Sequence, residues 1–209
     1  MNKINYDLEM QKIIDGFSAD ERPSLLLHSC CAPCSTAVIE RLIENFTVTV
    51  FYFNPNITES EEYNLRLNEQ KRYLKETYGD RVNLIEGRYK AVEFFDVAKG
   101  LNKEPEGGKR CEKCFELRLY ETAKVAKEGG YRYFCTTLTV SPHKNADVIN
   151  EIGKVAGEKY GVEFLPCDFK KRGGYQRSCE LSQKNELYRQ NYCGCIYSKY
   201  AHIKADDEE

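Results

Sequence analysis

Short apolar runs alternate with amphipathic stretches along most of the chain, and this alternation predicts strands followed by helices. The apolar runs have the length and the β-branched or aromatic content of buried strands, and they cover residues 25–27, 47–53, 82–85, 134–140 and 162–165. The stretches between them predict helices over residues 37–45, 59–78, 91–98, 115–128 and 148–160. Residues 1–22 predict a further helix outside the sheet, and the chain from Gly173 on is predicted to be mostly helical.

Strands that alternate with helices favour right-handed crossovers, and therefore an α/β fold whose mostly parallel sheet has helices on both faces. The 209 residues, 41% of them apolar, suffice for one domain with a real core. We expect a single domain over residues 1–209, with an α/β core at about 23–170 and a helical, Cys- and Tyr-rich extension at about 171–200. No stretch has the length of a membrane span, and the charged N-terminus is unlike an export signal, so we expect a cytoplasmic protein.

Polar segments follow four of the predicted strands, and they carry most of the reactive side chains. Carboxyl ends of parallel strands share one edge of the sheet, which is where ligands bind in such folds. The sequence therefore predicts that a cysteine loop, a His143–Lys144–Asn145 cluster and Asp168 with two lysines lie at one edge. The segments are HSCCAPC (28–34), NPN (54–56), SPHKN (141–145) and PCDFKK (166–171).

The chain has ten cysteines, and three of them, Cys30, Cys31 and Cys34, occur within five residues after the first strand. In a chain of this length with an α/β pattern and no export signal, metal or redox use is favoured over a disulfide scaffold. Ser35 and Thr36 are the expected N-cap of the next helix. Thiolates near a helix N-terminus have lowered pKa values, which suits metal binding or redox chemistry. The alternative is one buried structural cysteine with two bystanders.

A second group, Cys111 and Cys114, has CxxC spacing in the predicted loop before the helix over 115–128. Together with the first group it makes five thiols, and four thiolates can hold either a tetrahedral zinc or an iron–sulfur cluster. The adjacent pair Cys30–Cys31 suits the several metal corners of a cluster better than the four corners around one zinc. The geometry therefore favours an iron–sulfur cluster, and zinc remains the alternative.

A third group is Cys193-Gly194-Cys195. A disulfide across a single residue closes a small, strained ring, and strained disulfides are the easily reduced, redox-active ones. The alternatives are two further metal ligands or a turn with two inert thiols. Cys135, inside a predicted strand, is expected to be a small buried hydrophobic residue.

Five motifs, in order from about Leu25 to Ser198, give the chain a resemblance to a known family. The motifs HSCCAPC, EPEGGKRCEKCFELRL, TTLTVSPHKN, LPCDFKK followed by GGYQRS, and YRQNYCGCIYS resemble the QueH-type epoxyqueuosine reductases. The resemblance implies a Rossmann-like fold similar to the adenine-nucleotide hydrolases. It also implies a cobalamin-independent iron–sulfur oxidoreductase that reduces epoxyqueuosine to queuosine at the wobble position of tRNA.

The resemblance also implies roles for individual residues. Cys30, Cys31, Cys111 and Cys114 would bind a [4Fe-4S] cluster, and Cys193 and Cys195 would be a redox-active pair. An additional iron beside the cluster could act on the epoxide oxygen as a Lewis acid. Whether Cys34 or Asp168 is a metal ligand stays open, and the sequence does not identify the electron donor.

Three other expectations concern the reaction and the partner. His143, Lys144 and Asp168 are candidate proton donors, and His28 either tunes the cluster or merely ends a strand. Basic and aromatic residues interleave in the C-terminal part, as expected for a surface that stacks an RNA base and holds phosphates, or else for a packed pair of helices. These residues are Tyr175, Arg177, Tyr188, Arg189 and Tyr192.

Two other classes of function compete with the reductase. One is a zinc-stapled nucleic-acid-binding module without catalysis, in which the pair Cys193–Cys195 would be inert. The other is a nucleotide enzyme that has kept ATP chemistry, which predicts a Gly-Ser-rich loop after the first strand. This sequence has thiols at that position instead.

Overall fold

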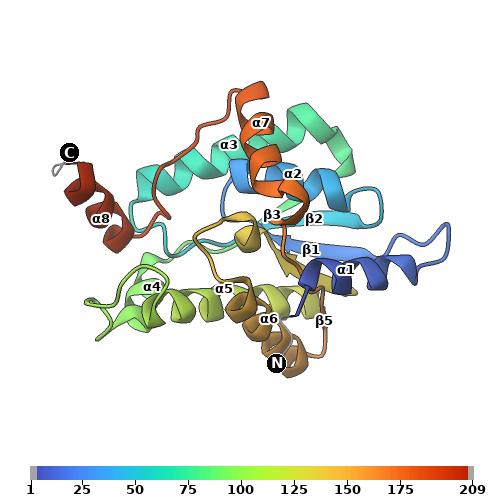
Figure 1. Ribbon diagram of the computed structural model, residues 1–209, viewed down its shortest axis with the longest axis horizontal. Helices are drawn as coiled ribbons and strands as arrows, with labels where there is room; N and C mark the ends of the chain where they lie inside the picture. The colour runs from blue at the N-terminus through green and yellow to red at the C-terminus, as the bar shows by residue number, and fades with distance from the viewer. Residues whose placement is uncertain (1–3, 207–209) are drawn as a thin grey trace.

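The computed structural model describes residues 4–206, and its centre is a five-stranded sheet in which all neighbouring strands are parallel (Figure 1). The strand order is β3-β2-β1-β4-β5. This confirms the predicted α/β fold class. The strands are β1 (Ser24–His28), β2 (Thr47–Tyr52), β3 (Asn83–Glu86), β4 (Tyr133–Thr136) and β5 (Glu163–Phe164).

Helices cover both faces of the sheet because side chains alternate between the two faces of each strand. Leu25 and Leu27 face one apolar cluster with Val38 and Ile39 of α2, whereas Leu26 faces the other with Ala123 of α5. In Figure 1, α2, α3 and α7 lie on one side of the sheet, and α4, α5 and α6 lie on the other. The helices are α1 (Tyr6–Asp15), α2 (Ala32–Leu42), α3 (Ser60–Tyr78), α4 (Ala91–Ala98), α5 (Lys109–Glu128), α6 (Ala146–Tyr160), α7 (Gly174–Lys184) and α8 (Ile196–Asp206).

The two helices that follow cysteine-rich segments, α2 and α5, begin at least five residues earlier than the sequence predicted. Helix α2 begins at Ala32, so its N-cap is Cys31, and the prediction of an N-cap at Ser35 or Thr36 was wrong. Proline is well suited to a first helical turn, and Pro33 occupies that place here. Helix α5 begins at Lys109 because the carboxylate of Glu104 accepts the first helical N–H, 3.1 Å away. The CxxC thiols therefore lie in helical turns and not in a loop.

Two other predicted segments are shorter or less regular than expected. The strand predicted over 134–140 ends at Thr136, and residues Thr137–Val140 form a 3-10 helix, because the Thr136 hydroxyl accepts the Leu138 N–H. In the C-terminal part, α7 and α8 flank an irregular segment over 185–195. None of the helices in residues 4–206 is long and apolar enough to cross a membrane.

Candidate metal centre and active site

The site lies where the order of the strands reverses. From β1 the chain goes to β2 on one side, whereas β4 pairs with β1 on the other, so the loops after these two strands diverge and leave a crevice. The loop after β1 carries Cys30 and Cys31, and the segment after the 3-10 helix carries His143 and Lys144. The predicted gathering of the first and fourth strand ends at one edge is therefore observed.

The first thiol group is a compact cluster. The sulfur atoms of Cys30, Cys31 and Cys34 all lie within 4.8 Å of one another, and the Sγ atoms of Cys30 and Cys31 are 3.9 Å apart. Cys34, whose role the sequence left open, belongs to this group because it lies in the first turn of α2, directly after the N-cap Cys31 and Ala32–Pro33. Three donors at this spacing suit a metal.

Buried hydrogen bonds hold the cysteine loop in place. The Ser29 hydroxyl donates to Gln70 Oε1 at 2.7 Å, and Gln70 Nε2 donates to the Ser35 hydroxyl at 3.0 Å. From the other side of the crevice, the Thr137 hydroxyl accepts the Cys30 N–H at 3.2 Å. Asn54 Nδ2 donates to the Ser29 carbonyl at 2.8 Å, so the β2 end also supports the loop. The sulfur atoms are thus fixed by polar contacts from three elements.

The three thiols are not electrostatically equivalent. Hydrogen bonds from Cys31 and Cys34 hold the pKa of Cys30 well below its usual value. The same contacts, together with burial, raise the pKa of Cys31 to about 12 and that of Cys34 above its usual value. One negative charge is therefore favoured on Cys30, where the other two thiols donate to it.

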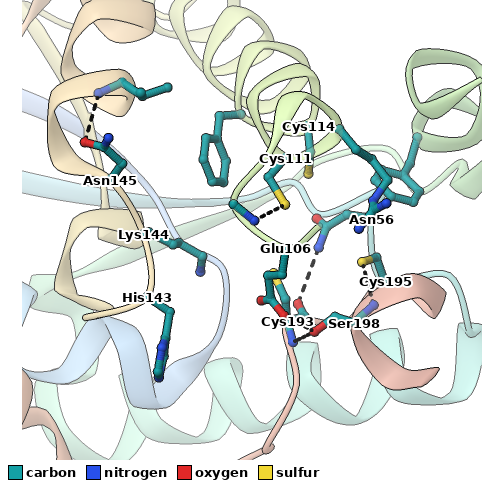
Figure 2. A pocket seen from close by; sticks show the side chains of 15 residues that line it. Asn56, Glu106, Cys111, Cys114, His143, Lys144, Asn145, Cys193, Cys195 and Ser198 are labelled. Atoms are coloured by element: carbon teal, nitrogen blue, oxygen red, sulfur yellow. Dashed lines mark hydrogen bonds between the residues drawn. The ribbon is translucent and has the colours of Figure 1, made fainter. Parts of the chain in front are cut away.

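The remaining four candidate thiols line an adjoining cavity of about 90 Å³. Cys111 and Cys114 come from α5, and Cys193 and Cys195 come from the C-terminal segment (Figure 2). Burial raises the pKa of Cys111, and it raises that of Cys114 to about 12. Cys30 and Cys111 pack against the same apolar cluster, which links the two thiol groups through one patch of core.

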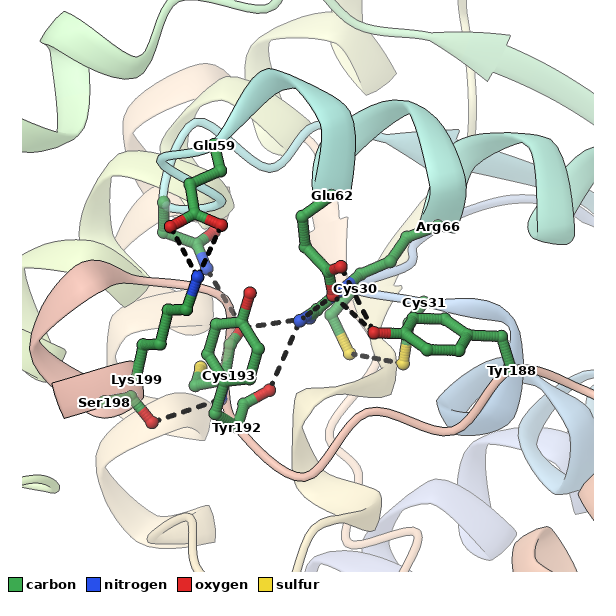
Figure 3. Close-up of polar contacts among 11 residues, drawn as sticks. Cys30, Cys31, Glu59, Glu62, Arg66, Tyr188, Tyr192, Cys193, Ser198 and Lys199 are labelled. Carbon is green, nitrogen blue, oxygen red and sulfur yellow. Dashed lines mark hydrogen bonds and ion pairs between the residues drawn. The ribbon is translucent and has the colours of Figure 1, made fainter. Parts of the chain in front are cut away.

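Cys193 and Cys195 are free thiols in the irregular segment. Side chains and one backbone amide from the α3 region hold this segment (Figure 3). Arg66 donates to the carbonyls of Cys193 at 3.3 Å and Tyr192 at 3.4 Å, and the Thr58 N–H donates to the Gly194 carbonyl at 3.2 Å. Cys193 lines the small cavity and also a second, larger one, so it is common to both.

The larger cavity, of about 680 Å³, opens over the first thiol group. His143 and Lys144 line both cavities. Burial alone would lower the pKa of Lys144, but negative charge on Cys193, Cys30 and Cys34 raises it. The Lys144 amine is therefore held as a cation beside the thiols, and it remains a candidate proton donor together with His143.

Two predicted residues lie elsewhere. Asp168 forms an ion pair with Lys170 at 2.7 Å, and it is not among the described residues that line these two thiol cavities. The ring nitrogens of His28 lie 2.9 Å from the Thr136 hydroxyl and 3.1 Å from the Phe53 carbonyl. Burial lowers the pKa of His28 to about 3, so this ring is neutral. These contacts support the reading of His28 as the end of a strand.

The basic and aromatic residues of the C-terminal part divide into two groups. Tyr175, Arg189 and Tyr192 line the larger cavity. Arg177 forms ion pairs with Glu40 and Glu180, and the Tyr188 hydroxyl bonds to Glu62, so these two have protein partners. Three of the five predicted residues thus line the cavity, where Arg189 lies over the Tyr175 ring and Arg66 lies over the Tyr192 ring.

Sequence reasoning missed three site residues that the structure places beside the thiols. Arg66 and Arg118 are almost fully buried, and each falls on the apolar face of its helix. In the sequence, the signal for these two residues was a charged side chain at a helical position that should be buried, which is unusual unless the charge has a partner. Glu106 is the one carboxylate among the described residues that line the two cavities, and it accepts a hydrogen bond from Ser198.

Comparison with known proteins agrees with this architecture. The family model for epoxyqueuosine reductase QueH matches residues 25–201. Epoxyqueuosine reductase QueH of Staphylococcus epidermidis is 46% identical over 202 residues, covering 94% of this chain and 85% of that protein. The corresponding protein of Thermotoga maritima is 37% identical over 180 residues, covering 84% of this chain and 90% of its own.

A solved structure with the same fold is more distant in sequence. The U34-tRNA thiolase NcsA from Methanococcus maripaludis, with its [4Fe-4S] cluster, superimposes with a TM-score of 0.50 at 13% identity. The match covers 91% of this chain and 67% of that one, and it concerns the fold. The family model and the relatives cover most of the sequence, including every thiol group described above. This chain therefore belongs to the epoxyqueuosine reductase QueH family.

Proposed function

We propose that this chain reduces epoxyqueuosine in tRNA to queuosine at an iron–sulfur centre held by Cys30, Cys31, Cys111 and Cys114. The observation that carries the proposal is the gathering of seven cysteine residues around two adjoining cavities at the strand reversal. Family membership supplies the reaction.

The donor set fits an iron–sulfur cluster. All four candidate ligands are cysteine sulfur atoms. Cys30 and Cys31 are adjacent in sequence and directly precede α2, and Cys111 and Cys114 lie in the first turns of α5. Thiolate ligands of this kind suit iron–sulfur clusters. Cys34 lies beside Cys30 and Cys31, and we propose it as the ligand for an additional iron. The thiolase of similar fold carries a [4Fe-4S] cluster, which is consistent with this choice.

Reduction of the epoxide to an alkene releases one water, and it consumes two electrons and two protons. A bound cluster would supply electrons one at a time, so a two-electron store is useful. Oxidation of the Cys193–Cys195 dithiol to a disulfide releases two electrons and two protons, which balances the reaction. His143 and Lys144, beside Cys193, are the proposed groups that deliver a proton to the departing oxygen.

The larger cavity is the proposed place for the modified base. Its volume of about 680 Å³ lies in the usual range for ligand pockets. Tyr175 and Tyr192 offer aromatic faces for stacking, and Arg189 offers a charge for phosphate. A base flipped out of the anticodon loop would then lie over Cys30 and beside Cys193.

The test uses protein purified without oxygen and an anticodon stem-loop RNA that carries epoxyqueuosine. We expect a brown protein with roughly stoichiometric iron and sulfide, and formation of queuosine in the RNA. Binding of the RNA should weaken as salt is added. Full activity in a protein that contains only zinc would contradict the proposed centre. Conversion of the free nucleoside at an equal rate would contradict the proposed RNA recognition.

A further inference from the structure

Arg118 is a buried cation without an acidic partner. Its side chain is fully buried in the middle of α5, one turn after Cys114. Nη1 donates to Asn56 Oδ1 at 2.9 Å and lies 3.9 Å from the Cys114 sulfur. The Nε and Nη2 atoms are buried and have no hydrogen-bond partner among the described residues. The guanidinium is therefore held firmly, but its charge is not balanced by a carboxylate.

The other buried arginines of the site differ from Arg118. Arg66 forms an ion pair with Glu62 at 2.6 Å, and Arg110 donates to three backbone carbonyls. Burial of a charge without compensation is costly. Among the described residues, the side-chain atoms that the Arg118 guanidinium contacts are Asn56 Oδ1 and the Cys114 sulfur. A thiolate that binds a metal at this place would therefore be the available counter-charge.

Arg118 also belongs to a chain of hydrogen bonds that joins two thiol groups. Asn56 accepts from Arg118 through Oδ1 and donates through Nδ2 to the Cys193 carbonyl at 3.4 Å. Arg118 contacts Cys114 of the CxxC helix at the other end of the chain. Two side chains, Arg118 and Asn56, therefore connect the CxxC helix α5 to the Cys193–Cys195 segment.

We propose that Arg118 is the resident counter-cation of the thiol centre and a positioning residue that joins Cys114 to Cys193 through Asn56. The role of Arg118 rests on the proposed function in one respect, which is that the thiols carry a metal centre with a net negative charge. Such a cation stabilises the more negative, reduced form of the centre and retains the metal. Without the metal the same cation is uncompensated, so it should lower the stability of the protein.

The experiment compares Arg118→Met, which removes the charge, with Arg118→Lys, which keeps it. Arg88→Met is the matched control, because it removes the same charge from a residue whose partners are the carboxylates Glu93 and Glu121. Each full-length protein is melted in its metal-free, reduced form. Each is also loaded with iron and sulfide, and then the rate of iron release to a chelator and the midpoint potential are measured.

We expect metal-free Arg118→Met to melt at or above the parent protein, because an uncompensated buried charge has been replaced by an apolar side chain of similar length. When loaded, it should release iron at least tenfold faster. The equilibrium constant for one-electron reduction of its metal centre should change about tenfold in favour of the oxidised form. This change corresponds to a midpoint potential about 59 mV more negative. Arg118→Lys should stay within about threefold of the parent in both loaded measurements, and Arg88→Met should match the parent.

Two results would overturn the proposal. One is a metal-free Arg118→Met that melts below the parent, which would make the guanidinium a structural element. The other is iron release and potential equal to those of the parent. If the parent itself binds no iron, the proposed cluster fails, and the melting comparison alone decides the role of Arg118. If Arg118→Met does not fold, the proposal is likewise overturned, because it requires the metal-free variant to be at least as stable as the parent.

Discussion

The thiols at the end of β1 and those of the C-terminal segment are held in different ways. Cys30 and Cys31 follow a central strand and precede a helix, and buried bonds among Ser29, Gln70 and Ser35 fix their loop. Cys193 and Cys195 lie in the irregular segment 185–195. That segment is attached to the rest of the protein mainly by side chains of neighbouring elements that bind its carbonyls.

The difference matches the chemistry proposed for each group. Metal ligands must keep their positions, and ligands on the ends of regular elements do so. A dithiol that becomes a disulfide must bring its sulfur atoms to about 2.05 Å, which needs local movement of the backbone. A segment without its own ladder of backbone hydrogen bonds can move in this way while the metal ligands stay in place.

The largest expected effect is loss of the metal centre. Cys111→Ala removes a proposed ligand, so anaerobically purified protein should lose its brown colour and most of its iron. Cys135→Ala removes a fully buried thiol in β4, away from both cavities, and should keep the colour. Measured iron and sulfide per chain decide the matter. Equal iron in both variants would exclude Cys111 as a ligand.

The next effect is on the C-terminal pair alone. Gly194 has a φ of +110°, and a Cβ there would lie 2.9 Å from Ile57 and 3.1 Å from Arg66. Gly194→Ala should therefore displace the segment, at a cost of about 1–3 kcal/mol of local strain. We expect turnover to fall more than tenfold while iron content stays at the level of the parent.

Gly100→Ala is the matched control for Gly194→Ala. Gly100 also has a positive φ, of +79°, but an added Cβ would meet no atom within 4 Å, and Gly100 lines neither thiol cavity. It should therefore cost only the backbone strain, with a smaller loss of turnover. An equal loss in both variants would show that crowding against Arg66 and Ile57 is unimportant.

The smallest expected effect concerns the attachment of the segment to α3. Glu69 accepts the Tyr188 N–H at 2.7 Å, and the hydrogen bond from Arg72 is the main cause that holds the pKa of Glu69 below its usual 4.5. The folded form thus binds fewer protons than the unfolded form at mildly acidic pH. The stabilisation is complete above about pH 4.5 and is lost as the pH falls through the lowered folded pKa.

Glu69→Gln should therefore weaken the attachment by about 1 kcal/mol at pH 7, and the difference from the parent should shrink below about pH 4.5. Hydrogen exchange of the peptide over 185–195, compared between the two proteins at each pH, measures this directly. A difference that does not depend on pH would mean that the ionised carboxylate is not what holds Tyr188.

The order of strands and helices could be predicted from the sequence because apolar periodicity decides it. The first residues of α2 and α5 could not be predicted, because their N-caps, Cys31 and Gly108, make no side-chain hydrogen bond to the helix. In α5 the first helical N–H is instead bound by the carboxylate of Glu104, which lies outside the helix. The sequence motifs named the thiols that line the site. The proximity of Cys34 to Cys30 depended on where α2 begins, and so it stayed open.

The polar neighbours of the thiols were harder to predict. Arg118 reads in the sequence as an ordinary charge on a long helix, and its burial beside Cys114 depends on how α5 packs against the sheet. Asp168 was a candidate because it follows a predicted strand, and the structure adds that Lys170 is its ion-pair partner, so its role in the reaction stays a prediction. Local pattern identifies reactive residues, whereas their partners are set by tertiary packing.

The most direct test of the central claim is a single turnover without an electron donor. Iron-loaded, fully reduced protein is mixed anaerobically with the epoxyqueuosine stem-loop, and free thiols are then alkylated and located by mass spectrometry. We expect one disulfide between Cys193 and Cys195 for each queuosine formed, and no second turnover until a reductant is added. Queuosine formed while both of these thiols remain free to alkylate would contradict it.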